Sequence, residues 1–390
     1  MKATSLQTTQ LIFDALRPDQ TPDRWEFSFK NIHADWNDLA VRAIVFGLAP
    51  QLHYRLSKWG IQPPSSAFGK LAVTFAAHEK RNQAIAAQLA EVVTFCHARG
   101  LHPVALKGVH LAQTVYEVPA LRPMNDIDLL FPADELLEAE RVLSELGYGG
   151  KHKDPTLGPG ITKHTSTYRR EGQEGATSNP YLSAEAGRMV EPHVSLEESW
   201  FGLTVDITPG VHQRAEQVSL GGTMCRTLAV EDLFLHLYVH FCFHLIMGAP
   251  SMVQLTDLLK VAQNLPFDAS KFVDRVHSAG AAPYAYAGMT VSKTLLSAPI
   301  PEDVRQKVGE AVPSALRSQI DQLGLEDILA RTQKKPLNTF VDRLRRGLED
   351  RAETAGWAVG WTNKLRVWST ALTFWKTDTG LLLAGKETKT

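Results

Sequence analysis

Apolar residues recur at helical spacing through the first hundred residues. The segments 27–60 and 68–100 both place apolar side chains at i, i+3 and i+4. Pro63 and Pro64 interrupt the pattern between the two segments, and Gly100 follows the last apolar turn, where a glycine commonly ends a helix. The pattern therefore predicts a helical N-terminal region over residues 1–99.

The period changes directly after Gly100. The short apolar run 104–106 predicts a buried strand that leads into a turn at Lys107-Gly108, and helical spacing resumes over 109–117. A second strand is predicted over 126–131 and a helix over 134–147. Strand, helix, strand and helix thus follow one another within about 50 residues.

Polar and turn-forming residues are frequent from 151 to 190. We expect a strand in 161–170, an exposed loop over 173–188, and a further strand over 189–194, whose Pro192 suggests an edge or a bulge. After Thr227 the spacing is helical again. The sequence predicts an α+β protein with a small mixed sheet in residues 100–230, flanked by helical regions 1–99 and 231–390.

Composition and charge narrow the class of protein. Hydrophobic residues make up 44% and charged residues 21%, which is typical of a globular chain. The 41 Lys and Arg residues nearly balance the 42 Asp and Glu residues, so the net charge of −1 argues against a dedicated nucleic-acid binder and favours small or peptide-like substrates. The three cysteines form no CxxC pair, and no apolar run approaches the ~20 residues that span a bilayer. The N-terminus lacks a signal-peptide pattern, and we therefore expect a cytoplasmic protein.

The candidate chemistry concentrates between residues 107 and 128. Asp126 and Asp128, at i and i+2 on a strand, project from the same face and can share one or two divalent cations. Gly108, in the preceding turn, would let backbone N–H groups approach phosphate at a helix N-terminus, and Lys107 can supply positive charge. Taken alone, an Asp-x-Asp pattern is more often a solvated strand end.

The surrounding residues carry a resemblance to a known family. The segment 106–148 contains L-K-G, then R-P-M-N-D-I-D-L-L, then a helix that ends in G-Y. It resembles the nucleotidyltransferases of the DNA polymerase β-like superfamily, and specifically the uncharacterised nucleotidyltransferase family. Met189-Val-Glu-Pro-His193 is similar to the V-E-x-H strand of that family, and the segments 214–244 and 254–262 are similar to its following helices. The resemblance covers roughly residues 30 to 265.

The resemblance implies a reaction and a ligand set. It implies transfer of a nucleotidyl group from an NTP to an acceptor hydroxyl or phosphate, with two metal ions, Mg²⁺ or Mn²⁺, held by three carboxylates. Asp126 and Asp128 match the first two carboxylates. Glu191 is the better match for the third, with Asp206 as its competitor. The third carboxylate would bind the metal that lowers the pKa of the acceptor, or act as general base.

The chain also departs from the wider superfamily. Val109 stands where Ser or Gly usually follows the first glycine, and residues 110–125 form a longer spacing before Asp126 than is usual. The hydroxyl that normally contacts phosphate is therefore missing, and Lys107 is the candidate replacement. The donor is accordingly left open between an NTP and a nucleotide sugar. By analogy with the family, a role in peptide natural-product biosynthesis is a specific hypothesis.

Other side chains near these motifs have two interpretations each. Arg122, four residues before Asp126, could contact a phosphate or be a surface or capping arginine. His193 shares the strand face of Glu191 and could hydrogen-bond acceptor or phosphate. A helical row of histidines could chelate a transition metal. Packing against other helices explains the row with fewer assumptions. A third interpretation places His240 and His244 at the substrate end of the pocket. The row consists of His236, His240 and His244.

The region 331–376 is unusual in composition. Nine basic and four acidic residues lie between 331 and 370, and four tryptophans fall at positions 357, 361, 368 and 375. The simplest interpretation is a helix that packs its Trp face on the rest of the protein. A groove for an acidic or phosphorylated peptide and an interfacial membrane helix are the alternatives.

These observations lead to one preferred function and two others. We expect a metal-dependent nucleotidyltransferase that binds a nucleotide donor and modifies a small molecule or a peptide. The second hypothesis is a toxin-like transferase that modifies RNA ends, and the third is a non-catalytic nucleotide- or partner-binding module. Three strand carboxylates that face one point would repel each other without a cation, which speaks against lost chemistry. The sequence leaves the donor base, the acceptor and the oligomeric state open.

Overall fold

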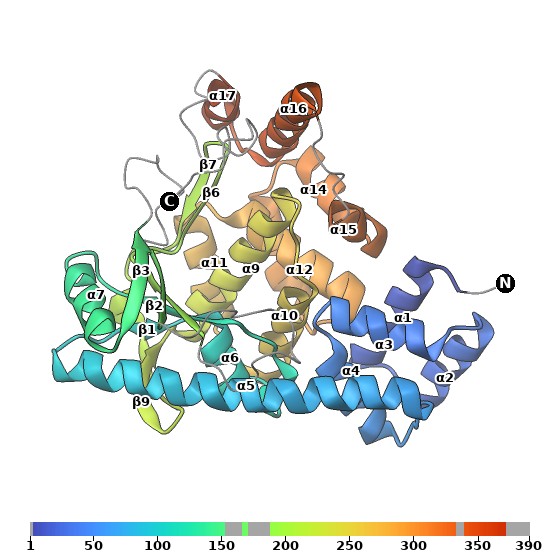
Figure 1. The fold of residues 1–390 in the computed structure, drawn as a ribbon. Helices are drawn as coiled ribbons and strands as arrows, with labels where there is room; N and C mark the ends of the chain where they lie inside the picture. The colour runs from blue at the N-terminus through green and yellow to red at the C-terminus, as the bar shows by residue number, and fades with distance from the viewer. Residues whose placement is uncertain (1–2, 153–165, 171–187, 333–338, 372–390) are drawn as a thin grey trace.

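A computed structural model of the chain describes residues 3–152, 166–170, 188–332 and 339–371. Its fold is α+β, as the sequence predicts, and a mixed sheet has the strand order β3-β4-β5-β2-β1-β9-β8 (Figure 1). The seven strands are β1 (Val104–Ala105), β2 (Asp126–Leu130), β3 (Tyr148–His152), β4 (Ser166–Arg170), β5 (Met189–His193), β8 (Glu216–Leu220) and β9 (Thr223–Thr227). A separate antiparallel ribbon contains β6 (Glu197–Trp200) and β7 (Leu203–Asp206).

The N-terminal region is helical, which confirms the prediction from its spacing. Four short helices precede one long helix, which runs across the base of the molecule from these helices to the sheet (Figure 1). Pro64 stands at the N-cap of the long helix, and Gly100 follows its end with φ +74°, a backbone conformation that glycine adopts without strain. The helices are α1 (Ser5–Leu16), α2 (Pro22–Asn31), α3 (Trp36–Val45), α4 (Ala49–Trp59) and α5 (Ser65–Ala98).

The predicted alternation of strands and helices after Gly100 is also confirmed. Strand β1 leads into α6 (Lys107–Thr114), a 3₁₀ turn at Pro119–Leu121 precedes β2, and α7 (Leu136–Glu145) ends before Gly147. Strand β2 pairs antiparallel with β1 and parallel with β5, so the two motif-bearing strands β2 and β5 are neighbours. Most of the predicted loop 173–188 lies outside the described residues.

The expectation that Pro192 marks a sheet edge or bulge is wrong. Strand β5 lies between β4 and β2, inside the sheet. The carbonyl of His193 accepts from the N–H of Phe131, so the backbone of His193 faces β2 and that of Pro192 faces β4. On that side β4 pairs with β5 only through Tyr168 and Val190. The missing N–H of Pro192 therefore removes no hydrogen bond from the pairing with β2.

The two faces of the central strands have opposite character. Ile127, Leu129 and Val190 are fully buried in an apolar core that includes residues of α5, α6 and α7. Asp128 and Glu191 are direct register partners, and a paired position in a parallel sheet directs both side chains to one face. Asp128 and Glu191 thus lie on the face of the sheet opposite this apolar core.

The C-terminal region is helical as well, and it packs with the N-terminal helices in one large core. Its helices are α9 (Val230–Ile246), α10 (Met252–Asn264), α11 (Ala269–Ser278), α12 (Ala282–Leu296), α13 (Glu302–Glu310), α14 (Ser314–Asp321), α15 (Leu325–Thr332), α16 (Phe340–Trp357) and α17 (Trp361–Ser369). The short helix α8 (Val211–Arg214) precedes this region, between β7 and β8. Within the described part of the chain, none of the helices combines the length and apolar character that crossing a bilayer requires.

The simplest interpretation of the tryptophan region is wrong. Trp357 is buried at the end of α16, but Trp361 and Trp368 on α17 are 77% and 43% exposed. Helix α17 instead buries Val367. Gly360, with φ +83°, separates α16 from α17, so Trp357 does not share a helix with Trp361 and Trp368. Trp375 lies outside the described residues.

Candidate active site

The parallel pair β2 and β5 brings three possible metal ligands together. One ligand atom each of Asp128, Glu191 and His193 lies within 4.8 Å of the other two. Asp128 opposes Glu191 in the register, and His193 follows on the same face. Asp126 projects from that face two residues before Asp128. Of the predicted carboxylates, Glu191 therefore lies at this point of the sheet.

Asp128 lies between a histidine and a lysine. Its Oδ1 lies 2.6 Å from Nε2 of His193, and its Oδ2 lies 3.5 Å from Nζ of Lys107. The side chain is 5% exposed. Glu191 accepts a hydrogen bond of 3.2 Å from the hydroxyl of Thr167. His193 thus makes a direct contact with Asp128. Its contact with acceptor or phosphate stays a prediction.

The electrostatics of the group favour an added cation. The pKa of Asp126 is raised to about 7, first by burial and then by repulsion from Asp128 and Glu191, while Lys107 and Arg122 act in the opposite direction. Burial lowers the pKa of Lys107, but the surrounding carboxylates outweigh it and leave the pKa raised. The three carboxylates together carry more negative charge than the ammonium group of Lys107 neutralises. A hard divalent cation suits such a set of oxygen ligands.

The backbone of the L-K-G turn holds Lys107 beside Asp128. The N–H of Leu106 donates to the carbonyl of Asp128 at 3.0 Å, and Lys107, the next residue, begins α6 with φ +38°. A positive φ strains a residue that has a Cβ, and such strain is commonly found at functional sites. We therefore count Lys107 among the residues of the candidate site.

Gly108 has a packing role that the sequence did not reveal. A Cβ at this position would lie 2.5 Å from Nη1 of Arg122. The guanidinium of Arg122 donates to both carboxylate oxygens of Asp257, from Nε at 3.1 Å and from Nη2 at 2.9 Å. Tyr116 donates to the same carboxylate at 2.7 Å. Arg122 is accordingly a buried, paired side chain and not a surface or capping arginine.

Asp257 was not recognised from the sequence as part of the site. It stands in the L-T-D-L-L segment of α10, where a lone acid among apolar residues was the available signal. The pairing fixes α10 against the turn that precedes Asp126. Because the pair is buried, removing either partner would leave an uncompensated charge.

A cavity of about 770 Å³ opens over this face of the sheet. Asp126, Asp128 and Lys107 line it, together with residues of the α3–α4 turn, helix α5, helix α9 and the start of α10. Arg81 of α5 donates to the side-chain oxygen of Asn125 at 3.2 Å. On the opposite side, His240 of α9 lies 2.7 Å from Glu198. The contributions from α5 and β6 come from distant parts of the chain, and the motif residues alone did not predict them. His240 and His244 of α9 both line the cavity, which agrees with the interpretation that placed them in the pocket.

Asp206 lies in a different environment. It is exposed on β7, where it pairs with Glu197, and its Oδ1 accepts from the backbone and the hydroxyl of Thr208. The cluster of metal-ligand atoms in the described residues includes Glu191 and not Asp206. In the histidine row of α9, the rings of His236 and His240 stack with their centroids 5.7 Å apart.

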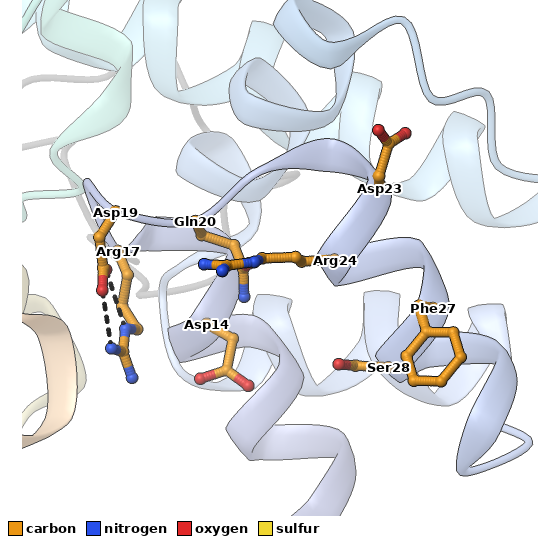
Figure 2. Close-up of a pocket in the computed structure, with 8 residues that line it drawn as sticks. All are labelled: Asp14, Arg17, Asp19, Gln20, Asp23, Arg24, Phe27 and Ser28. Carbon is orange, nitrogen blue, oxygen red and sulfur yellow. Dashed lines mark hydrogen bonds and ion pairs between the residues drawn. The ribbon is translucent and has the colours of Figure 1, made fainter.

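A second hollow lies on the N-terminal helices and differs from the first. It has a volume of about 530 Å³ and is lined by the end of α1 and the start of α2 (Figure 2). Its carboxylates do not converge, and the exposed Asp19 is paired with the half-buried Arg17 at 3.0 Å (Figure 2). Such a surface ion pair contributes little and indicates no ligand.

Comparisons with known proteins agree with the motifs. The family model described as "Uncharacterised nucleotidyltransferase" matches residues 33–297, which is more than half of the chain. A solution structure of the antibiotic-resistance factor ANT(2'')-Ia is 12% identical and covers 50% of this chain and 91% of its own, with a TM-score of 0.34. That score is too low to transfer any detail. A comparison with curated proteins gives no match. The family match extends over both motif strands and the helices that close the cavity, and the chain belongs to the uncharacterised nucleotidyltransferase family.

Proposed function

We propose that this chain is a Mg²⁺- or Mn²⁺-dependent nucleotidyltransferase whose reaction takes place in the cavity over β2 and β5. The observation that carries the proposal is the convergence of Asp128, Glu191 and His193 within 4.8 Å, beside Asp126. Asp126, Asp128 and Glu191 would hold the metal ions. When bound, the ions would neutralise the phosphates of the donor and lower the pKa of the acceptor hydroxyl.

The remaining residues of the site bind and orient. Lys107, held next to Asp128 by the strained turn, is placed to neutralise donor phosphate. His193 fixes one oxygen of Asp128, which leaves the other directed towards Lys107. Arg122 borders the cavity while Asp257 holds its Nε and Nη2. Nη1 makes a long contact of 3.5 Å with the carbonyl of Pro123, and it is the atom we assign to phosphate contact. Gly108 leaves the space that this guanidinium occupies.

The donor is an NTP or a nucleotide sugar, and the acceptor is a small molecule or a peptide. The cavity is large enough for a nucleotide, and apolar side chains of the α3–α4 turn and Val253 line it together with the carboxylates. This mixed lining suits an acceptor with apolar as well as polar groups. A tailoring step in natural-product biosynthesis is one reaction of this kind.

The experiment is pyrophosphate release from each of the four NTPs, with Mg²⁺ or Mn²⁺ and a panel of hydroxyl-bearing small molecules and peptides. Nucleotide sugars are tested in parallel for release of their sugar phosphate. We expect metal-dependent release from one donor class that Asp128→Asn abolishes and Asp206→Asn leaves intact. Equal rates for the wild type and Asp128→Asn would refute the proposal.

A further inference from the structure

A buried histidine of the cavity wall is paired with a buried carboxylate. Both residues come from elements other than β2 and β5, which carry the proposed metal ligands. Nδ1 of His240 on α9 lies 2.7 Å from Oε1 of Glu198 on β6. His240 is 8% exposed and Glu198 is 3% exposed. His240 also lines the cavity that Asp126 and Asp128 line. His240 therefore belongs to the wall of the cavity, Glu198 contacts it from within the protein, and both are almost excluded from water.

The contact determines which ring nitrogen of neutral His240 carries its proton. An ionised carboxylate only accepts hydrogen bonds, so the contact with Glu198 requires N–H at Nδ1. The lone pair of the neutral ring then lies on Nε2. Glu198 thereby prepares Nε2 as a proton acceptor and would stabilise the imidazolium that forms after proton uptake.

The pair is coupled to the metal-ligand group through Lys107. Glu198 is among the carboxylates whose charge raises the pKa of Lys107, and Lys107 lies 3.5 Å from Asp128. Two further rings of α9 flank His240, with centroids at 5.7 Å for His236 and 4.4 Å for His244. This packing and the contact with Glu198 fix the orientation of the His240 ring.

We propose that His240 is the general base of the transfer reaction and that Glu198 is its positioning residue. The inference rests on the proposed function and assigns a part of it that the family likeness left open. Glu191 is committed to the ligand group with Asp128 and His193, whereas His240 lines the cavity and stands outside that group. Glu191 would thus bind the metal ion, and His240 would act as the general base. Both roles were considered for the third carboxylate from the sequence.

In this step the proton of the acceptor hydroxyl moves to Nε2 of His240. The acceptor oxygen forms a bond to the α-phosphorus of the donor as the bond from that phosphorus to the bridging oxygen breaks. The leaving group, pyrophosphate for an NTP, departs with the bonding electron pair. The imidazolium is stabilised by Glu198 and afterwards releases its proton to water.

The test uses water as the acceptor, because the natural acceptor is unidentified. Metal-dependent hydrolysis of α-labelled NTPs is measured for the wild type, His240→Asn, His240→Ala, Glu198→Gln and the control His277→Asn, which changes an exposed histidine on α11. Asn at 240 retains a donor for Glu198 but removes Nε2. We expect kcat to fall by about 10²-fold in His240→Asn with KM for the NTP within about twofold. Free imidazole should restore part of the activity of His240→Ala.

The controls separate this proposal from the proposed function. Glu198→Gln should lower kcat by about 10-fold, and His277→Asn, on the surface of α11, should keep the wild-type kcat. A wild-type kcat in His240→Asn would overturn the base assignment. Asp128→Asn at full activity, or a wild type that shows no metal-dependent NTP binding, would instead overturn the proposed function.

A second measurement does not depend on turnover. Nitrogen-15 NMR of histidine-labelled protein reports the tautomer of each neutral ring, and the spectrum of His240→Asn assigns the signal. We expect the Nδ1–H tautomer for His240 and its loss in Glu198→Gln. An Nε2–H tautomer for His240 in the wild type would overturn the proposal, even if water does not serve as an acceptor.

Discussion

Two pairs of strands in this molecule place carboxylates opposite each other, and their surroundings differ. Asp128 faces Glu191 across the parallel strands β2 and β5, and Glu197 faces Asp206 across the antiparallel ribbon β6 and β7. The first pair has an apolar core behind it and Lys107 and His193 beside it. In the second pair Asp206 is exposed and satisfied by its own loop through Thr208.

The comparison shows that a cross-strand pair of acids is not sufficient to make a site. Asp206 is exposed, so water screens part of the repulsion within the second pair, although burial and the charge of Asp206 still raise the pKa of Glu197. In the first group Asp128 is buried and Glu191 is half-buried, and the charges of both add to burial, the larger cause, in raising the pKa of the neighbouring Asp126 to about 7. Burial, register and a nearby cation thus distinguish the group on β2 and β5 as the candidate metal site.

The largest expected effect is that of Asp128→Asn. Loss of this carboxylate removes the ligand that the register, His193 and Lys107 all fix. Transfer should fall by about 10³-fold or more, since a bound metal ion supplies several kcal/mol of stabilisation to the transition state. Single-turnover assays with saturating donor measure this loss, and circular dichroism checks that the fold persists. An activity within tenfold of the wild type would show that Asp128 holds no metal.

The second prediction compares the two candidates for the third carboxylate directly. Glu191→Gln should lower transfer by about 10²-fold, because one charged ligand of the group is replaced by a neutral one. Asp206→Asn, the matched change on the exposed ribbon, should leave the rate within about twofold. Steady-state kinetics of both variants decide the matter. A reversed order of the two effects would assign the third ligand to Asp206.

The pH dependence of metal binding is the third prediction. The pKa of Asp126 is raised to about 7 in the metal-free protein, so a proton competes with the metal below that pH. Metal affinity should be constant well above pH 7 and weaken as the pH falls through it. Titration with Mn²⁺ at a series of pH values measures the midpoint. In Asp126→Asn the transition near pH 7 should be absent, and its persistence there would assign the transition to another group.

The smallest predicted effect concerns the glycine beside Arg122. Gly108→Ala places a Cβ 2.5 Å from Nη1 of Arg122, so the guanidinium or the turn must move. We expect a loss of about 1–3 kcal/mol in the free energy of unfolding. Gly69→Ala in α5, where no atom lies within 4 Å of the added Cβ, should be neutral or stabilising by up to ~1 kcal/mol. Urea denaturation compares the two, and equal free energies would contradict the packing role of Gly108.

Much of the fold could be predicted from the sequence because its signals are local. Helical spacing, Pro64 and Gly100 define the long helix, and the D-I-D-L-L run defines β2. The place of Pro192 inside the sheet could not be predicted, because it depends on how far β4 extends along β5. The exposure of Trp361 depends likewise on the break at Gly360.

The candidate site was predictable only in its motif residues. Asp126, Asp128, Glu191 and His193 stand in two short motifs, but only strand register brings the motifs to one point. Asp257, Glu198 and Arg81 enter the site from segments that are distant in the chain. A single acid in an apolar helix does not reveal its partner, since that partner is determined by tertiary packing.

Donor binding tests the central claim most directly. Thermal unfolding is measured with ATP, GTP, CTP, UTP and nucleotide sugars, each with and without Mg²⁺, for the wild type and for Asp126→Asn/Asp128→Asn. A ligand that binds the native state raises the Tm by mass action. We predict a rise with one donor class that requires Mg²⁺ and is lost in the double variant. An equal Mg²⁺-dependent rise in both proteins would place the nucleotide elsewhere and contradict the account.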